Sequence, residues 1–189
     1  MADKLVTSVL WRRKDIASLE LFTLTERKNE YVLAGTVVCA LDGAPARCVY
    51  EVVCSAEWRT KQVRVDLERA GELTTLELSA DGNGVWRCDD TELVHLRGLI
   101  DVDISVSPST NTLAIRRCRL ESGQSIAVAA AWIRLPALTI EPLPQEYTRT
   151  GQHSYRYASR GGAFTADLTV DDFGLVVRYG EYWERVDLT

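Results

Sequence analysis

The sequence predicts an all-β fold, a curved antiparallel sheet that forms a spiral β-roll or an incomplete barrel. Three observations support this prediction. Apolar and polar residues alternate through most of the chain, turn-forming residues separate the alternating stretches, and a strand–turn–strand pattern recurs after 90 residues. A sheet that curls in this way loses exposed edges and can enclose a cavity lined by alternate side chains.

The alternation places the strands in order along the chain. Val63, Val65 and Leu67, for example, share one face of a stretch whose intervening residues are polar, which is typical of a half-solvated antiparallel strand. Only residues 91–97 look helical, and the proline-rich residues 136–144 are expected to cross between two halves. The predicted strands span residues 18–25, 31–39, 46–54, 59–67, 73–78, 85–88, 102–106, 126–135, 154–158, 163–170 and 174–179.

The recurring pattern suggests that the sheet is built from two similar β repeats. Residues 59–84 align without gaps with residues 149–174, and the identities include Arg59 with Arg149, Asp81 with Asp171 and Gly84 with Gly174. We therefore expect a single domain over residues 1–189, with repeats at about 31–90 and 121–189. The alternative is that unrelated β-hairpins share the same turn residues.

Composition narrows the classes of function. The net charge of −5 argues against nucleic acid as a main partner, because phosphate binding needs a basic face. Five cysteines in no CxxC spacing predict no metal site, and they are expected to be small buried or edge thiols. No nucleophile elbow, zinc-protease or nucleotide-binding motif occurs, so no cofactor is expected and an enzyme is not favoured.

Hydropathy predicts no membrane span. The longest apolar run, residues 126–133, is far shorter than the ~20 residues that cross a bilayer. The apolar stretch near the start is too short for the core of a signal peptide, so the cytoplasm is the expected location. The sequence gives no indication of the oligomeric state.

One candidate for chemistry is a pair of carboxylates. If residues 99–108 form a strand, Asp101 and Asp103 share one face with Ser105. Two carboxylates at this spacing could act as acid and base on a sugar bond. The alternative is a solvated strand face whose carboxylates pair with arginines.

A second candidate is the polar string that follows, in which Thr110, Asn111 and Thr112 precede Arg116 and Arg117. In an extended chain the two arginines point to opposite faces. One would face solvent, and the other would either bind a carboxylate or phosphate group inside a cavity or pair with Asp101 or Asp103. The alternative is a structural ion pair between adjacent strands.

A third candidate is the aromatic-rich last third of the chain. Tyr155 and Tyr157 alternate and so share a face, and aromatic rings with polar tips can line a pocket for an amphiphile. Ordinary packing of a β core is the alternative. The aromatic residues are Tyr147, Tyr155, Tyr157, Phe164, Phe173, Tyr179, Tyr182 and Trp183.

These segments carry a resemblance to a known family. Residues 96–117, 145–149 and 155–179 resemble the bacterial family described as "putative glycolipid-binding", and the string Asp-x-Asp…Thr-Asn-Thr-Leu-x-Ile-Arg-Arg is its most specific part. Residues 58–60 are similar to the family's tryptophan segment. Two departures are Ala114, where the family has proline, and Ser109, where it often has an aromatic residue.

The resemblance implies a rolled sheet similar to periplasmic lipoprotein and glycolipid carriers. Three hypotheses follow: non-enzymatic binding of a lipid or glycolipid-like amphiphile in a β-roll cavity, a structural or protein-interaction module, and a carbohydrate-active hydrolase or lyase using Asp101 and Asp103. In the first, apolar strand faces hold the tail and a polar rim holds the head. The candidate ligand-binding residues are Trp58, Arg59, Asp101, Asp103, Thr110, Asn111, Thr112, Arg116, Arg117, Gln145, Tyr147, Tyr155 and Tyr157.

Overall fold

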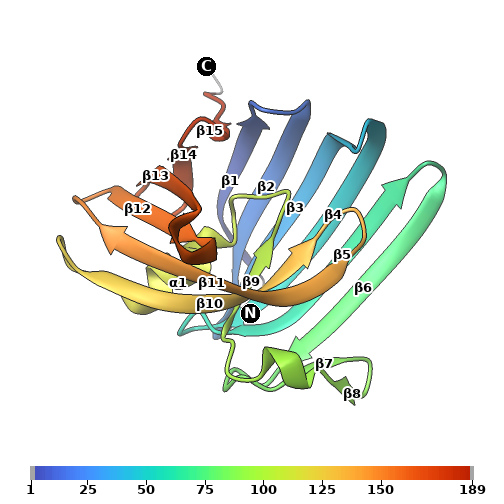
Figure 1. Cartoon of the computed structure of the whole chain (residues 1–189), viewed down its shortest axis with the longest axis horizontal. Coiled ribbons are helices and arrows are strands. Elements are labelled where there is room, and N and C mark those ends of the chain that lie inside the picture. The colour runs from blue at the N-terminus through green and yellow to red at the C-terminus, as the bar shows by residue number, and fades with distance from the viewer. Residues whose placement is uncertain (1–2, 188–189) are drawn as a thin grey trace.

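The computed structural model describes residues 3–187, which form one sheet of 15 strands with the order β8-β7-β6-β5-β4-β3-β2-β1-β15-β14-β13-β12-β11-β10-β9 (Figure 1). The strands are β1 Lys4–Arg13, β2 Ser18–Arg27, β3 Glu30–Leu41, β4 Ala44–Ser55, β5 Thr60–Arg69, β6 Glu72–Ala80, β7 Trp86–Cys88, β8 Thr91–Glu92, β9 Asp101–Ile104, β10 Ser125–Arg134, β11 Thr139–Arg149, β12 Ser154–Ser159, β13 Phe164–Val170, β14 Val176–Tyr179 and β15 Trp183–Arg185. The helices are the 3₁₀ turns η1 Val94–Leu96 and η2 Arg160–Gly162, and α1 Asn111–Cys118.

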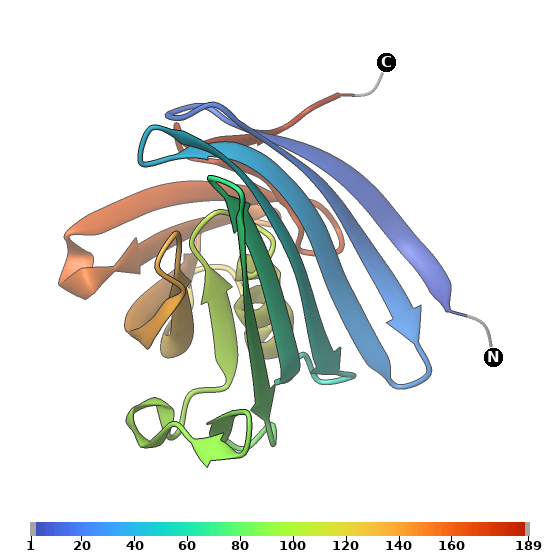
Figure 2. The same ribbon diagram turned by 90° about the vertical axis from the view of Figure 1, so that its right-hand side faces the viewer.

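The sheet curves strongly but does not close. Neighbouring strands pair antiparallel, except that β9 and β10 run parallel, and the β1–β15 pair joins the first strands of the chain to the last. Figure 2 shows the strands bending around β9 and α1, which lie inside the curve. The prediction of an all-β, curved and incomplete barrel is confirmed.

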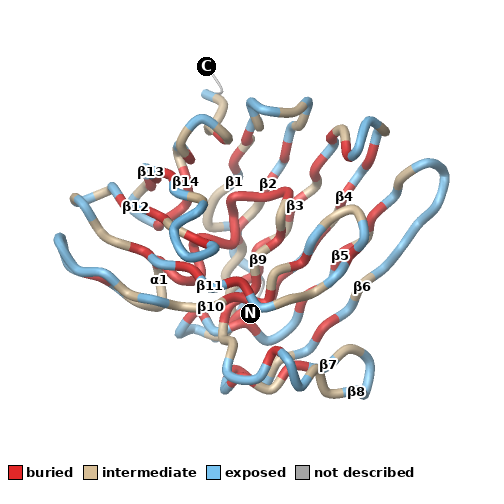
Figure 3. The backbone as a smooth tube through the Cα atoms, in the orientation of Figure 1, coloured by how far each residue is buried: buried red, intermediate tan, exposed pale blue. Residues whose placement is uncertain are grey.

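Alternate side chains turn inward and form one apolar core. In β5, for example, Val63, Val65 and Leu67 are buried, whereas Gln62 and Arg64 are exposed, as the period of two predicts. Figure 3 shows this alternation of buried and exposed positions along the longer strands. The largest fully buried side chains include Trp11, Phe22, Leu33, Tyr50, Trp58, Trp86, Leu96, Ile104 and Leu113.

The stretch from β8 to α1 differs from the predicted helix over 91–97. Residues 91 and 92 form the short strand β8, and only Val94–Leu96 form a single 3₁₀ turn. The chain then enters the curve of the sheet, where Leu96, Val102 and Ile104 are buried in the core. This segment therefore fills the inside of the curved sheet, although β9 also extends the sheet by pairing in parallel with β10.

The prediction of an extended chain over residues 109–117 is wrong, because Asn111–Cys118 form the helix α1. Eight residues are too few for a helix to stand alone in water, so packing must hold it. Leu113, Ala114 and Ile115 are buried in the core, and Arg119 ends the helix in a left-handed conformation with φ of 47°. Burial of this apolar turn, which alternation alone does not reveal, decides the local structure.

The prediction that residues 136–144 cross between halves is also wrong. Residues 135–138 connect the hairpin of β10 and β11, and Pro142 and Pro144 lie within β11. Strand β12 pairs only with Gln145–Arg149, so the earlier part of β11 has no partner on that side. A proline, which lacks an N–H group, is tolerated where a strand edge is unpaired.

The sequence also gave no prediction for β1 and β15. The register of β1 with β2 shifts between Leu5 and Thr7, which interrupts the alternation that would have revealed the strand. Strand β15 has only three residues. The predicted small buried or edge thiols are found as three buried cysteines and two half-buried ones, all without disulfide bonds in the described part of the chain.

Two repeats remain a prediction, which the turns at Asp81 and Asp171 support. Asp81 Oδ1 accepts hydrogen bonds from the N–H groups of residues 83 and 85. Asp171 Oδ1 accepts the corresponding bonds from residues 173 and 175. The two turns, 90 residues apart, thus share their hydrogen bonds as well as their sequence, and each connects a long strand to a short one, β6 to β7 and β13 to β14.

A glycine in β3 allows a tyrosine to cross the inner face of the sheet. Gly35 lies directly opposite Tyr50 of β4, and a Cβ atom added at Gly35 would lie 2.3 Å from the Tyr50 ring. The ring crosses β3 at this point, and its hydroxyl group donates a hydrogen bond to Glu20 in β2. Any larger residue at position 35 would displace the ring.

We therefore expect Gly35→Ala to lower the free energy of unfolding by about 1–3 kcal/mol, because overpacking forces side chains out of their preferred positions. Chemical denaturation of the purified variant measures this loss. Gly151→Ala is the matched control, since its Cβ would make only an ordinary contact at 3.6 Å with Ser154. Equal stability of the two variants would contradict the steric argument.

Candidate functional site

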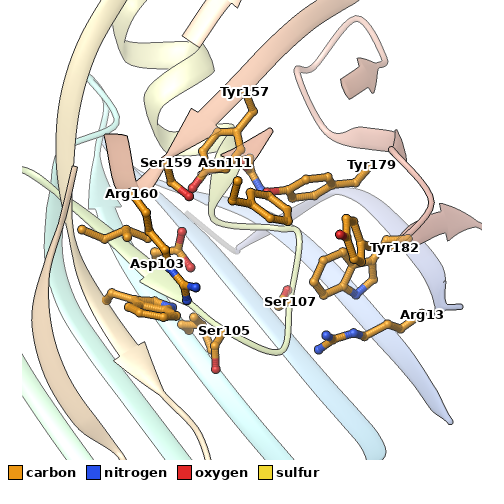
Figure 4. Close-up of a pocket in the computed structure, with 15 residues that line it drawn as sticks. Arg13, Asp103, Ser105, Ser107, Asn111, Tyr157, Ser159, Arg160, Tyr179 and Tyr182 are labelled. Atoms are coloured by element: carbon orange, nitrogen blue, oxygen red, sulfur yellow. The ribbon is translucent and has the colours of Figure 1, made fainter. Parts of the chain in front are cut away.

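A pocket of about 300 Å³ opens between the loop that joins β9 to α1 and the last strands of the sheet (Figure 4). We call it the aromatic pocket. Its wall includes one residue of β1 and residues from nearly every element from β9 to β15. The lining residues are Arg13, Asp103, Ile104, Ser105, Ser107, Asn111, Trp132, Leu143, Tyr157, Ser159, Arg160, Phe164, Tyr179, Tyr182 and Trp183.

Aromatic rings form one side of this pocket. The ring centroid of Tyr157 is 5.8 Å from that of Tyr179, and Tyr179 is 5.3 Å from Trp183. Phe164 and Tyr182 lie 5.3 Å apart and are partly exposed. The alternation of β12 and β13 places Tyr157 and Phe164 on the inner face, so the rings gather where these strands curve inward.

Asp103 brings a carboxylate to the same space. Its Oδ2 accepts a 2.6 Å hydrogen bond from the Gln145 side chain, whereas Oδ1 receives no hydrogen bond from the described residues. Burial raises the pKa of Asp103 to about 6, and the bond from Gln145 partly offsets this effect. Asp103 is therefore mainly ionised at neutral pH and has one oxygen available to a ligand.

Two arginines lie over the rings of tryptophans in this pocket. The Arg160 guanidinium is 5.0 Å from the Trp132 ring, and that of Arg13 is 4.5 Å from the Trp183 ring. Arg13 is also bound by Asp15 through two hydrogen bonds. Arg160 has no carboxylate within 4.0 Å among residues 3–187. Figure 4 shows Arg160 and Asp103 pointing into the same part of the pocket.

Beneath the pocket lies a buried carboxyl group. Glu20 Oε1 accepts a 2.7 Å hydrogen bond from Ser107, which lines the pocket, and another from Tyr50. Ser109 is bonded to both Ser107 and Tyr50, which completes the cluster. Glu20 Oε2 is buried without a partner in the described chain, and burial raises the pKa of this group to about 7. The cluster fixes the loop before α1 to β2 and β4.

Asp101 and Arg117 form a buried ion pair. Arg117 Nε and Nη2 donate to the two oxygens of Asp101 at 3.1 and 2.5 Å, so the guanidinium binds the carboxylate with both arms. Although burial disfavours the cation, the bond to Asp101 and its charge raise the pKa of Arg117. Asp101 is only 2% exposed, so the predicted alternative of a solvated strand face is wrong, whereas pairing with an arginine is confirmed.

Four of the other predicted residues hold α1 and the loop before it in place. Asn111 accepts a 2.8 Å hydrogen bond from the Tyr147 hydroxyl, and Thr112 donates one to the Gly174 carbonyl. Thr110 accepts a bond from the Ile104 N–H group. These three hydrogen bonds tie the polar string to β11, to the turn at Gly174 and to β9. The partners satisfy its polar side chains, which explains why the string is buried rather than exposed.

Four further predicted residues do not line the aromatic pocket. The Arg116 guanidinium is 5.2 Å from the Trp58 ring, which itself stacks on Tyr31. Arg59 donates to the Gly82 carbonyl, and the Tyr155 ring lies 5.8 Å from the guanidinium of Arg149. These residues therefore lie apart from the aromatic pocket.

Of the thirteen candidate residues, only Asp103, Asn111 and Tyr157 line the aromatic pocket, while Gln145 and Tyr147 support them. Phe164, Tyr179, Tyr182 and Trp183, which belong to the aromatic-rich last third of the chain, also line this pocket. No sequence signal pointed to Arg13, Trp132 or Arg160, which lie far apart in the chain and meet only in the folded sheet. Asp101 does not line this pocket, so the two carboxylates do not face a common space there.

Two further observations concern the described residues as a whole. Within residues 3–187, no three side chains of histidine, cysteine, aspartate or glutamate lie close enough together to hold a metal ion. None of the helices in this part of the chain has the length and apolar character needed to cross a bilayer.

These features define the class of protein, an all-β chain in one open, curved sheet with a helix inside the curve and an aromatic pocket beside it. The chain belongs to the family described as "Putative glycolipid-binding", which matches residues 8–185. It is similar to the crystal structure of a DUF1089 family protein from Pseudomonas aeruginosa, with 33% identity and a TM-score of 0.80 over 89% of this chain and 92% of that one. Comparison with curated proteins finds no match.

Removing one partner of the buried ion pair should be costly. We expect Arg117→Met to lower the free energy of unfolding by about 3–5 kcal/mol, because Asp101 would remain buried and unpaired. Replacing both residues, as in Asp101→Asn with Arg117→Met, should recover part of this loss. Urea denaturation of the single and double variants gives the comparison, and a double variant less stable than Arg117→Met would rule out this account.

Glu20 should make stability depend on pH. Its unfolded-state pKa is near 4.5 and its folded-state pKa about 7, so the folded protein holds the proton more tightly. The free energy of unfolding should therefore fall as pH rises from about 4.5 to 7, by roughly 1–3 kcal/mol, and stay level above that range.

A neutral replacement isolates this effect. In Glu20→Gln the part of the fall in stability that comes from Glu20 should disappear. The free energy of unfolding of the variant should therefore rise relative to that of the natural protein as the pH rises. Denaturation at pH 5, 6, 7 and 8 measures it, and Glu68→Gln, on the exposed face of β5, is the control. Parallel pH profiles for the natural protein and Glu20→Gln would be incompatible with a raised pKa.

Proposed function

We propose that this protein binds, without catalysis, the sugar headgroup of a glycolipid-like amphiphile in the aromatic pocket. The observation that carries the proposal is the meeting of aromatic rings with the free oxygen of Asp103 in one space of about 300 Å³. Ligand sites combine apolar walls with a few well-placed polar groups, and this pocket has that composition.

The lining matches the two kinds of surface on a sugar. The C–H faces of a pyranose ring are apolar and pack against aromatic rings such as those of Trp183 and Tyr182. Its hydroxyl groups need acceptors and donors at the edge, which Asp103 Oδ1 and the Arg160 guanidinium supply. A charge-assisted bond of a hydroxyl group to a carboxylate is stronger than a neutral one.

The acyl tail is proposed to leave through the mouth of the pocket. The inner faces of the first strands are occupied by large buried side chains such as Trp11, Phe22 and Leu33, which supports a headgroup in the pocket rather than a tail among those strands. Phe164 and Tyr182, both partly exposed, flank the exit and would contact the first methylene groups.

Two alkyl probes with the same tail test this proposal. Octyl glucoside, below its micelle concentration, should quench or enhance the fluorescence of Trp132 and Trp183 with saturation. Octyl tetraethylene glycol ether, which has no sugar, should bind at least about tenfold more weakly, because it leaves Asp103 unpaired. Equal affinity for both probes, or binding of neither, would contradict a sugar site.

Asp103 should also give this binding a pH dependence. Because its pKa is about 6, affinity for octyl glucoside should be higher at pH 7.5 than at pH 5, where the carboxylate is protonated. Asp103→Asn should bind about tenfold more weakly at pH 7.5 and show little change with pH. Asp167→Asn is the control, because Asp167 is an exposed residue outside this pocket.

A further inference from the structure

A second pocket, of about 360 Å³, lies at the opposite end of α1 from the aromatic pocket. We call it the basic pocket. The last turn of α1 supplies Ile115, Arg116 and Arg119, while Asn111 at the first turn lines the aromatic pocket. Residues 149–155 and the turn at Asp171–Gly174 form the remaining walls.

Positive charge without a protein partner gathers in this pocket. Within residues 3–187, eleven of the 18 arginines lie within 4.0 Å of a carboxylate. Of the other seven, Arg116, Arg119 and Arg149 all line the basic pocket. In a chain with a net charge of −5, three guanidinium groups that have no carboxylate partner among residues 3–187 thus surround one cavity.

Arg149 is held rigidly by neutral groups. Its three nitrogen atoms donate to the carbonyl oxygens of Gly151, Leu120 and Gln152, at 3.0, 2.7 and 2.6 Å. Carbonyl oxygens orient the guanidinium but leave its positive charge uncompensated. The fixed position means that a bound anion would meet a preorganised cation, which lowers the entropy lost on binding.

Arg116 and Arg119 approach from the helix. The stem of Arg116 packs on the turn at Gly174, where an added Cβ would lie 3.3 Å from the arginine Cδ, and its head rests 5.2 Å from the Trp58 ring. Arg119 is exposed and adopts the left-handed conformation that ends α1. Neither has a carboxylate within 4.0 Å in the described chain.

The two acidic residues of this pocket do not neutralise these arginines. Asp171 accepts two backbone N–H bonds through Oδ1, and its Oδ2 accepts a 2.7 Å bond from Arg185. Asp172 has a 93% exposed side chain, and its Oδ1 lies 3.7 Å from Nε2 of His153. The charge of Asp171 is therefore balanced by Arg185, and that of Asp172 is largely screened by water.

We infer that the basic pocket binds a phosphate group, either free or carried by a lipid headgroup. Guanidinium groups recognise phosphate oxygens through paired hydrogen bonds, and Arg116 and Arg119 line the same pocket as the fixed charge of Arg149. The competing explanation is that arginines in the last turn merely complement the helix dipole. That explanation does not account for Arg149, which comes from β11.

Titration calorimetry with inorganic phosphate at constant ionic strength tests the inference. The natural protein should bind phosphate with saturation, and Arg116→Gln with Arg119→Gln should weaken binding at least tenfold. Arg69→Gln with Arg87→Gln is the matched control, since these two arginines are also without carboxylate partners and removing them changes the net charge equally. The control should bind phosphate as the natural protein does.

Vesicles separate the two sources of phosphate. Binding to phosphatidylglycerol vesicles but not phosphatidylcholine vesicles, lost in the double variant, identifies a lipid headgroup, and saturable phosphate binding alone identifies a free ligand. If circular dichroism shows that the double variant is unfolded, the exposed Arg119→Gln change replaces it. Equal affinity of variant and control, or no binding of phosphate or vesicles by the natural protein, would overturn the inference, whatever the result for the aromatic pocket.

Discussion

Insertion of the segment from β9 to α1 into the curve of the sheet is the constraint on which the rest of the structure depends. The sheet does not close, so its apolar inner face needs a cover from within. Val102, Ile104 and Leu113 provide that cover, each buried in the common core. Burial of apolar area at roughly 25 cal/mol per Å² makes this segment part of the fold rather than an appendage.

The polar groups of that segment give it a fixed position. Asp101 binds Arg117 with both oxygens. The cluster of Glu20, Tyr50 and Ser107 ties the loop between β9 and α1 to strands β2 and β4. Burial of a polar group costs free energy unless the group is hydrogen-bonded or paired. The segment can therefore adopt few positions in which all of these groups keep their partners. The same ordering places Asn111 at one pocket and Arg116 at the other, so the two ends of α1 define the two candidate binding sites.

Part of the candidate site could be predicted from the sequence, and the reason differs between residues. Asp103 and Tyr157 were found because strand alternation places them on one face with other polar or aromatic groups. Pairing of Arg116 or Arg117 with Asp101 or Asp103 was one of the options that the sequence left open, and the structure pairs Arg117 with Asp101. Trp132 and Arg160 could not be found, because their contact joins β10 to the turn after β12, and nothing local marks a contact between positions 28 residues apart.

The sequence by itself determined most of the longer strands, their alternating faces and the tight turns between them, because these depend on neighbours along the chain. It did not determine α1, which is too short to form without the core around it, nor the prolines in β11, which are tolerated only because β12 leaves that edge unpaired. Only the tertiary structure decided which inward side chains meet. Curvature of the sheet, set by packing across the whole molecule, brings distant residues to one pocket.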